Sequence, residues 1–595
     1  PSRGLGDVYK RQLVGCTLFV SCNDFLDRPP VDKFTDEEFW QTETQARLFL
    51  YSIYPTLFGG FGTAQNPSWL EDVGDDAISA PIQNPYAPNI IPETDGSWGF
   101  TNIRKANYVI ASAPRLNEPE ATINHWLGIG HFLRGYFYSS LTFQYGDVPW
   151  FDRVMQQSDE KEDMDYLYKD RDPRNFVVEK NIEDFKFALN NTVRVNDGKL
   201  QINRYVVAAL VSRLMLREGT FQKYYLQNPE MAEKCLELAK TASEIVMAGP
   251  YQLAPNYKSL FTSDDLSDNP EIIMYREYSD KTVKHYMVNQ CYDIEQNGAS
   301  KSLLESFSRS DGFPVYYNNE YWFAPTATDF FTNRDPRLSY NFRPKYYPVG
   351  GSNAPYGYSR SGYSLRKFTD DEWETSNPNL KNRGQNITDA PCLRLGEVLL
   401  NYAEICYELE AITGKDLFNQ EVLNSTINKL RARVNMPNLE EIGGAPAING
   451  VVYDDPARTK WEPTNDVPSM LWEIRRERRV ELCYENGLRS ADLKRWKKLD
   501  YLCNQHNPDY RYGAYIVLDD FPSAVKDGIV LTGVISPDAQ QDASLSEGYI
   551  LRNTGTARNL PQPKNYVKPV PNSQISLYKS YGYTLSQTKE WQSEN

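Results

Sequence analysis

Hydrophobic residues recur at helical spacing along several stretches of this chain, and this periodicity constrains its fold more than any other sequence feature. Val178, Ile182, Phe185 and Leu189 follow one another at steps of four, three and four, which places them on one face of a helix over 176–191. The same pattern predicts helices over 121–144, 203–218, 230–248 and 396–410. We expect the helices over 203–218 and 230–248 to be separated by Gly219 and a loop that contains Pro229.

The helix predicted over 396–410 carries two apolar stripes, one with Val398 and Leu409 and one with Leu399 and Cys406. A helix with two apolar faces packs between two neighbours. Small residues are available where paired helices would cross, and they are Ala208, Ala209, Ala239, Ala242 and Ala403. We therefore predict a mainly α fold with tetratricopeptide-like packing of helical hairpins.

Long stretches rich in Tyr, Pro, Gly and Asn interrupt the helical pattern. We predict one domain over 35–595, with a helical scaffold mainly in 35–57, 101–250, 393–435 and 467–500 and loop-rich regions at 58–100, 308–392 and 505–595. Irregular segments of this length are uncommon in compact domains and are often functional. The loop-rich regions are thus the first place to look for a binding site.

The N-terminal segment resembles a targeting signal. Residues 1–12 are predicted to be a non-native or mis-assembled leader, and 13–21 to be the remnant of a signal peptide with a short apolar core. Ser21-Cys22 resembles the bacterial lipobox, so we expect Cys22 to be lipidated and 22–34 to tether the protein. The alternative is an N-terminal strand in which Cys22 is buried.

Composition and charge argue against several classes of function. The net charge of −15 argues against nucleic acid as a partner. The four histidines lack metal-ligand spacing, and no nucleophile elbow, phosphate loop or C-x-x-C pair is present, so we expect no catalytic residues, no metal and no cofactor. Aromatic residues make up 13% of the chain, which suits a binding surface built from rings. Six scattered cysteines are expected to be buried thiols: Cys235, Cys291, Cys392, Cys406, Cys483 and Cys503.

A series of short motifs resembles the SusD/RagB-like nutrient-binding outer-membrane lipoproteins, in that family's order. The motifs are CNDFLD at 22–27, WGFTNIRKAN at 98–107, LRGY at 133–136, YGDVP at 145–149, RDPRL at 334–338, LRLGEVLLNYAE at 393–404, RRERRVEL at 475–482 with GLR at 487–489, and YVKPVP at 566–571. The resemblance spans nearly the whole chain from residue 22. It rests on the series as a whole, because each string is weak by itself.

This resemblance implies both a fold and a role. The fold would be an α-superhelix of tetratricopeptide-like hairpins that supports an irregular ligand-binding portion. The role would be to capture an oligosaccharide at the cell surface and deliver it to a SusC-like TonB-dependent transporter, with the lipid on Cys22 holding the protein on the outer membrane. Some members of the family bind peptides instead, so a peptide-binding lid stays open as an alternative.

Two loop regions, 66–102 and 307–323, combine aromatic rings with hydroxyl-binding side chains. A flat ring stacks on the C–H face of a pyranose, while carboxylates, amides and Arg bind its hydroxyl groups. The predicted ligand-binding residues are Trp69, Asp72, Asp75, Trp98, Asn102, Arg309, Tyr316, Tyr321 and Trp322. We expect these two regions to meet on one face of the molecule. Trp98 has a second interpretation, as a plug at the start of the following helix.

Two charged clusters allow other interpretations. Asp72, Asp75 and Asp76 could serve an extracellular glycoside hydrolase, which needs a pair of carboxyl groups. The group of Asp264, Asp265 and Asp268 could bind calcium, although it lacks the cadence of an EF-hand loop. In the charged segment 473–481, pairs three residues apart (Glu473 with Arg476, Arg478 with Glu481) are expected to form ion pairs along a helix.

Overall fold

A computed structural model gives the fold. It describes residues 39–63, 69, 74–78, 86, 89–154, 160–194, 197–292, 298–319, 329–344, 359, 361–370, 372, 384–503, 505–520, 530–536, 538–551 and 559–594. None of the helices described there has the length and hydropathy needed to cross a membrane. Cys22 and the rest of the predicted targeting segment lie outside the described residues.

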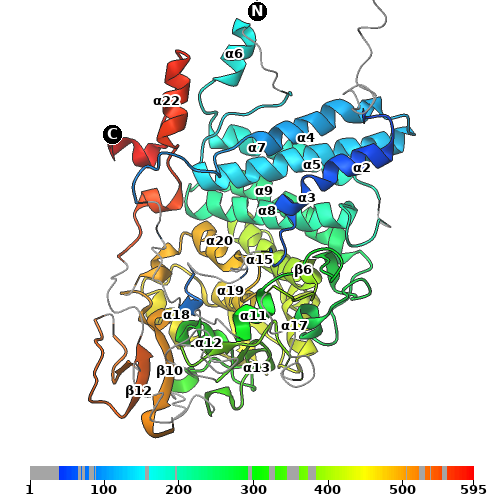
Figure 1. Ribbon diagram of the computed structural model, residues 1–595. Helices are drawn as coiled ribbons and strands as arrows, with labels where there is room; N and C mark the ends of the chain where they lie inside the picture. The colour runs from blue at the N-terminus through cyan, green and yellow to red at the C-terminus, as the bar shows by residue number, and fades with distance from the viewer. Residues whose placement is uncertain are drawn as a thin grey trace, which may run out of the picture.

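Antiparallel helical hairpins stack in layers and form one half of the molecule (Figure 1). The longer helices of this half are α2 (Glu43–Tyr51), α4 (Thr101–Ser112), α5 (Glu120–Tyr145), α7 (Arg174–Asn191), α8 (Arg204–Tyr224), α9 (Pro229–Met247) and α15 (Leu395–Thr413). Helix α5 packs between α4 and α7, α8 packs against α9, and α9 packs against α15. The predicted mainly α fold with tetratricopeptide-like hairpins is confirmed.

The hairpin of α8 and α9 corrects one predicted boundary. Helix α8 does not end before Gly219 but runs through it to Tyr224. A Cβ at Gly219 would lie 2.7 Å from Cγ of Leu236 on α9, so the glycine permits close contact between the two helices. Pro229 does not lie in a loop either: it occupies the first turn of α9, where proline is well tolerated.

Shorter elements form the other half, below the hairpins in Figure 1. Its helices are α10 (Ser259–Thr262), α11 (Met287–Tyr292), α12 (Lys301–Ser306), α13 (Pro336–Asn341), α16 (Gln420–Ser425), α17 (Ile427–Arg433), α18 (Pro456–Trp461), α19 (Ser469–Glu481) and α20 (Leu488–Arg495). The short helix α3 (Tyr54–Leu57) lies beside α2, among the hairpins (Figure 1). The paired strands are β1 (Ala77–Ile78) with β3 (Gly298–Ala299), β2 (Ile272–Arg276) with β6 (Ala390–Arg394), β4 (Phe342–Arg343) with β5 (Ser364–Leu365), and β7 (Glu440–Ile442), β8 (Ala445–Ile448) and β9 (Val451–Val452). The six predicted buried thiols are confirmed.

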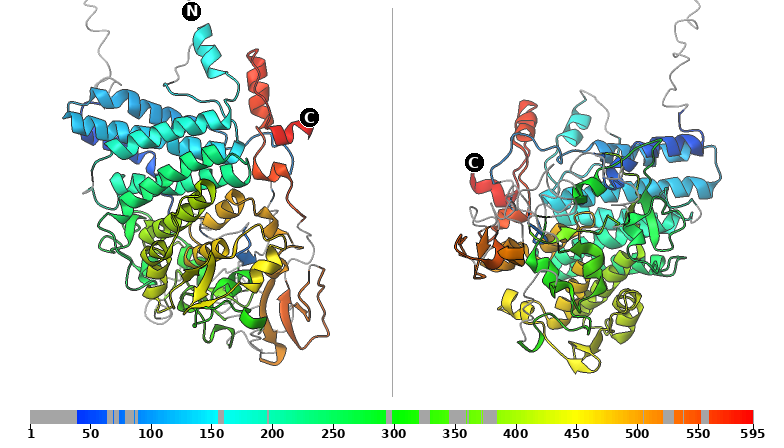
Figure 2. Two further views of the ribbon diagram at one scale, coloured as in Figure 1. Left: turned by 180° about the vertical axis from the view of Figure 1, so that it is seen from behind. Right: turned by 60° about the horizontal axis from the view of Figure 1, so that its bottom comes forward.

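The C-terminal region is more regular than the sequence indicates. We expected loops over most of 505–595, but β10 (Tyr512–Val517), β12 (Glu547–Leu551) and β11 (Leu531–Thr532) form an antiparallel sheet in that order. These strands are short and their buried and exposed residues do not alternate regularly, so their hydrophobic pattern gives little indication of a strand. Helix α22 (Asn572–Ser580) then projects beside α6 (Lys161–Leu167), as the views of Figures 1 and 2 agree. Stacking of Tyr168 on Tyr581, with ring centroids 4.7 Å apart, joins the segments that follow these two helices.

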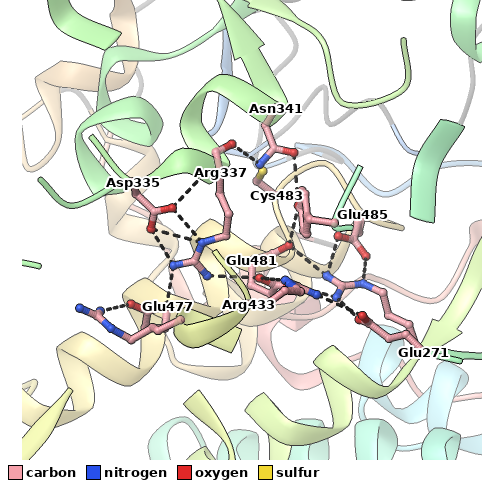
Figure 3. Close-up of polar contacts among 12 residues, drawn as sticks. Glu271, Asp335, Arg337, Asn341, Arg433, Glu477, Glu481, Cys483 and Glu485 are labelled. Carbon is pink, nitrogen blue, oxygen red and sulfur yellow. Dashed lines mark hydrogen bonds and ion pairs between the residues drawn. The ribbon is translucent and has the colours of Figure 1, made fainter. Parts of the chain in front are cut away.

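A buried ionic network joins helix α19 to four other segments (Figure 3). Arg337, at the start of α13, contacts Asp335 at 2.7 Å, Glu477 at 3.0 Å and Glu481 at 3.2 Å. Arg394, at the end of β6, lies 2.8 Å from Glu481. Since the segments that meet here are distant in the sequence, the network fixes the position of α19 in the lower half of the molecule.

Two further groups complete this network on its other side. Arg433, at the end of α17, lies 2.6 Å from Glu481 and 3.1 Å from Glu271, which precedes β2. Arg394 also contacts Glu271 at 2.9 Å and Glu485 at 2.8 Å. Glu481 thus receives three arginines from three different segments, which compensates for its complete burial.

The predicted helical ion pairs of α19 are half correct. Glu473 and Arg476 do form an ion pair. Arg478 instead binds Asp492 of α20 at 2.7 Å, while Glu481 faces the arginines of other segments. The local spacing allowed both pairs, but burial of α19 on every side favoured partners from its neighbours.

We predict that Glu481→Gln destabilises the protein by about 3–5 kcal/mol at pH 7, because it leaves buried arginines without a compensating charge. Burial opposes ionisation of Glu477, but Arg337 and Arg431 outweigh it and lower its pKa to about 2, and the pKa of Glu481 is lowered in the same way. Unfolded glutamates ionise near pH 4.3, so the stability that this network contributes is present above about pH 4.3 and is lost as the pH falls towards 2.

Urea unfolding between pH 7 and pH 2.5 measures both effects. Glu237→Gln, on the exposed face of α9, is the matched control and is expected to leave the unfolding midpoint unchanged. A Glu481→Gln protein as stable as the wild type would show that the network contributes nothing.

Candidate functional site

A cavity of about 560 Å³ opens between α12, α18, α19 and β12. Its volume lies within the range of small-molecule binding sites. Aromatic side chains from widely separated parts of the chain line it: Tyr316, Trp461, Trp472, Trp496, Tyr501 and Tyr549. Lys301, Lys460, Arg475, Arg476, Arg479 and Arg489 contribute positive charge to its wall, and Glu305, Asp455 and Asp509 contribute carboxyl groups.

Asp455 fixes the geometry of the aromatic part of the wall. As the N-cap of α18, its Oδ1 accepts a hydrogen bond from the backbone N–H of Ala457 at 2.9 Å. Its Oδ2 accepts a second one from Nε1 of Trp472 at 2.9 Å, and burial raises the pKa of this carboxyl group. Trp461, at the end of α18, packs edge-on against Trp472 and Tyr501, with ring centroids 5.8 and 5.2 Å apart. One side chain therefore holds together an aromatic corner of the cavity.

The arginines on the inner wall are held by carboxylates behind them. Arg479 contacts Asp76 at 2.7 Å and Asp75 at 3.0 Å, and Arg489 binds both oxygens of Asp75 at 2.8 Å. Burial opposes ionisation of Asp75, but Arg479 and Arg489 outweigh it and lower its pKa to about 2. The guanidinium groups are thus fixed in the wall as rigid hydrogen-bond donors.

Lysines and acids alternate on the outer wall. Asp509 lies 2.7 Å from Lys460 and 3.5 Å from Lys301, and Lys301 also forms an ion pair with Glu305. Oδ1 of Asp509 has no hydrogen-bond partner within the part of the chain that the structure describes. Lys301 donates a hydrogen bond to the hydroxyl of Tyr316 at 3.1 Å. The outer wall therefore offers both donors and acceptors beside aromatic rings.

Two of the predicted ligand contacts have side chains that lie buried in the protein interior. Trp69 is 1% exposed and packs against Phe61 and Phe368, with ring centroids 4.9 and 6.1 Å apart. Asp75 is 0% exposed and holds the two arginines described above. Asp76 is equally buried, so the proposed hydrolase lacks two accessible carboxyl groups among 74–78. Trp69 is enclosed by neighbouring rings and Asp75 by arginines of α19 and α20, and a loop sequence does not show such neighbours.

The other predicted residues that the structure describes are not brought together. Trp98 is 8% exposed and packs edge-on against Phe100 and Tyr145, so it plugs the start of α4. Asn102 lies half-buried in the first turn of α4, and Arg309 forms an ion pair with Asp311, both away from the cavity. Of the predicted set, Tyr316 lines the cavity. Asp72, Tyr321 and Trp322 lie outside the described residues.

Most of the side chains in the cavity wall were not predicted from the sequence. Trp461, Trp472 and Tyr501 lie in or beside segments interpreted as helical scaffold, and Tyr549 lies in a strand that was not predicted. The sequence did contain one indication of a binding site, because Trp472 lies on the charged face of α19. The calcium hypothesis for Asp264, Asp265 and Asp268 gains no support either, because no cluster of potential ligands within the described residues could hold a metal ion.

Comparisons with known proteins agree on one family. A family model described as the SusD family matches residues 270–591, which include every cavity-lining side chain named above. A SusD-like protein of Formosa agariphila is 23% identical over 520 residues, or 82% of this chain and 90% of that protein.

Solved structures share the fold. A SusD-like carbohydrate-binding protein from Bacteroides fragilis is 19% identical with a TM-score of 0.62, and the similarity covers 91% of this chain and 99% of that one. A laminarin-binding SusD-like protein is 16% identical with a TM-score of 0.52, covering 92% of this chain and 99% of that one. At these identities the likeness establishes the fold.

We predict that Trp69→Ala costs about 3–5 kcal/mol of stability, since it leaves a cavity in a core where Trp69 is packed between two rings. Trp69→Phe is the matched control. It restores most of the volume and loses no hydrogen bond, because Nε1 of Trp69 has no partner among the described residues. Chemical denaturation measures both, and a Trp69→Ala protein with wild-type stability would contradict this assignment to the core.

Proposed function

Because the chain belongs to the SusD family, we propose that this protein binds oligosaccharides in the cavity between α12, α18, α19 and β12. It acts in this proposal as a binding protein and not as an enzyme. The observation that carries the proposal is the wall of the cavity, in which six aromatic rings adjoin rigidly held charged groups.

This wall suits the two faces of a sugar. The weakly polar C–H face of a pyranose stacks on an aromatic ring, whose face carries partial negative charge. Trp472 and Tyr549 are only half-buried at the cavity, so each offers part of its ring to a ligand. The hydroxyl groups around the sugar's edge require donors and acceptors, which the arginines and Asp509 provide.

The relatives support the class of ligand. Two structures that share the fold are a carbohydrate-binding protein and a laminarin-binding protein. Those ligands belong to those two proteins, and here they favour oligosaccharides over peptides as the first ligands to test. In the sequence, Tyr321 and Trp322 follow the cavity-lining Tyr316 by five and six residues. We propose these two rings, with Asp72, as additional ligand contacts.

The binding protein would deliver its ligand to a transporter. We propose that a SusC-like TonB-dependent barrel carries the oligosaccharide across the outer membrane, as the resemblance to the family implies. A lipid on Cys22 would hold the protein on the cell surface beside that barrel. These two proposals rest on the family and on the lipobox-like Ser21-Cys22.

Trp472→Ala and Tyr549→Ala are each expected to weaken oligosaccharide binding tenfold or more, because each removes a ring that stacks on a sugar. Isothermal titration calorimetry against a panel of oligosaccharides and peptides measures this effect. Tyr581→Ala makes the same change as Tyr549→Ala at a remote ring that is 52% exposed, and it should bind normally. Wild-type affinity in both folded cavity variants, or binding of peptides alone, would refute the proposal.

Cys22→Ala is expected to release the protein from membranes of the native host, whereas Cys16→Ala, within the predicted signal segment, should leave it anchored. From gently solubilised membranes, the wild-type protein should co-purify with a TonB-dependent barrel. Recovery of the Cys22→Ala protein in the outer-membrane fraction at the wild-type level argues against the anchor. A wild-type protein that purifies alone argues against the transporter.

A further inference from the structure

A second cavity of about 640 Å³ adjoins the first. Arg475 and Trp496 line both cavities, so these two side chains form the boundary between them. The wall of the second cavity also has an aromatic side, where Tyr225 and Tyr566 stack with ring centroids 4.9 Å apart. The two cavities are thus neighbours on one surface. An elongated ligand that fills both would pass Arg475.

Arg475 is buried but poorly satisfied. Its side chain is 7% exposed, and its guanidinium group lies between the rings of Tyr224 and Trp496, 5.1 and 4.5 Å from their centroids. Within the described residues its one carboxylate contact is Glu408, at 3.5 Å, and its Nε has no hydrogen-bond partner. A guanidinium group has five N–H donors, and leaving them unused in a buried site is costly.

Glu408 is already engaged by other groups. It accepts hydrogen bonds from Lys223 at 2.5 Å and from the hydroxyl of Tyr224 at 2.7 Å, so it compensates Arg475 only in part. The surrounding ion pairs are Arg495 with Glu404 and Asp492, and Arg478 with Asp492. This described cluster therefore contains four cations (Lys223, Arg475, Arg478 and Arg495) and three carboxylates (Glu404, Glu408 and Asp492). One positive charge is in excess, and it falls at Arg475.

Lys497, on the wall of the second cavity, adds a second unmatched charge. Its backbone φ is 58°, a left-handed conformation that costs a lysine about 1–2 kcal/mol and that glycine or asparagine adopts more readily. No ion pair or side-chain hydrogen bond of its ammonium group is found among the described residues. Two carboxylates also line this cavity: Asp500 lies 3.1 Å from Nδ1 of His506, and Asp466 accepts a hydrogen bond from Thr464 at 2.7 Å. Among the described residues, neither forms an ion pair with Lys497.

We propose that the two cavities form one elongated site for an acidic oligosaccharide, in which Arg475 binds a carboxylate or sulfate group of the sugar chain. This inference rests on the proposed oligosaccharide binding and deepens it by assigning the charge of the ligand and its path. A carboxylate or a sulfate group can present two oxygens to the N–H donors of a guanidinium group that is desolvated and already oriented by two rings. Sugar units on either side of that anion would occupy the two cavities, with Trp472 on one side and Tyr566 on the other.

The test compares matched acidic and neutral ligands. Oligosaccharides of four to eight units prepared from polygalacturonate, alginate and a sulfated galactan are titrated beside their carboxyl-reduced or desulfated counterparts. The wild-type protein should bind at least one acidic member tenfold or more tightly than its neutral counterpart. Which pair shows this preference distinguishes carboxylate from sulfate.

Arg475→Gln should abolish that preference, so that the acidic member and its neutral counterpart bind with similar affinities. Arg475→Lys should restore part of it, because the charge returns without the bidentate geometry. Arg153→Gln removes the same charge from an exposed site outside both cavities and should change nothing. Lys497→Gln should weaken only the longer acidic ligands, which reach the second cavity. Melting temperatures identify any variant that fails to fold.

The two proposals fail in different ways. If neutral sugars bind as tightly as acidic ones in every pair, and Trp472→Ala still weakens them, the oligosaccharide site stands and the anionic assignment is wrong. An unchanged preference in folded Arg475→Gln also overturns the assignment. If no saccharide of either kind binds the wild-type protein, both proposals are wrong.

Discussion

The burial of Glu481 among three arginines is the interaction on which the arrangement of this molecule depends most. Arg337, Arg394 and Arg433 come from the start of α13, the end of β6 and the end of α17, and all three reach one carboxylate of α19. None of these segments is adjacent to α19 in the sequence. The contact therefore determines how these segments of the irregular half pack around α19 (Figures 1 and 3).

Helical geometry connects that network to the cavity. Glu473, Glu477 and Glu481 recur every four residues and lie along one side of α19, where the last two contact the network. Trp472, Arg475, Arg476 and Arg479 recur at steps of three, one and three and line the cavity on the adjacent side. A rotation of α19 would therefore disrupt both sides at once. Ionic networks of this kind often add little net stability, so we interpret this one as a means of fixing orientation.

The scaffold could be predicted from the sequence because its signal is local. The stripe from Val178 to Leu189 corresponds to α7, and the two apolar faces over 396–410 correspond to a helix packed between neighbours. Boundaries were less predictable where packing decides them. The sequence predicts that a helix ends before Gly219. In the structure this glycine lies inside α8, where it allows close contact with Leu236 on the next helix.

The candidate site could not be predicted in the same way, since it is assembled from distant segments. Trp69 and Asp75 have the composition of sugar-binding loops, but Phe61, Phe368, Arg479 and Arg489 cover them from other parts of the chain. Conversely, Trp472 and Arg475 lie on a helix that the sequence indicates as part of the scaffold. The packing of α18 and β12 around this helix creates the cavity. Tyr316 was selected because its loop combines aromatic rings with hydroxyl-binding side chains, and the structure places it at the cavity.

A crystal structure of the protein with a bound oligosaccharide tests the central claim most directly. The account predicts density for sugar rings against Trp472 and Tyr549, with hydroxyl or anionic groups within hydrogen-bond distance of Arg475. Density over another surface, such as the segment around Trp98 and Asn102, with the cavity between α12, α18, α19 and β12 left without sugar, would contradict it.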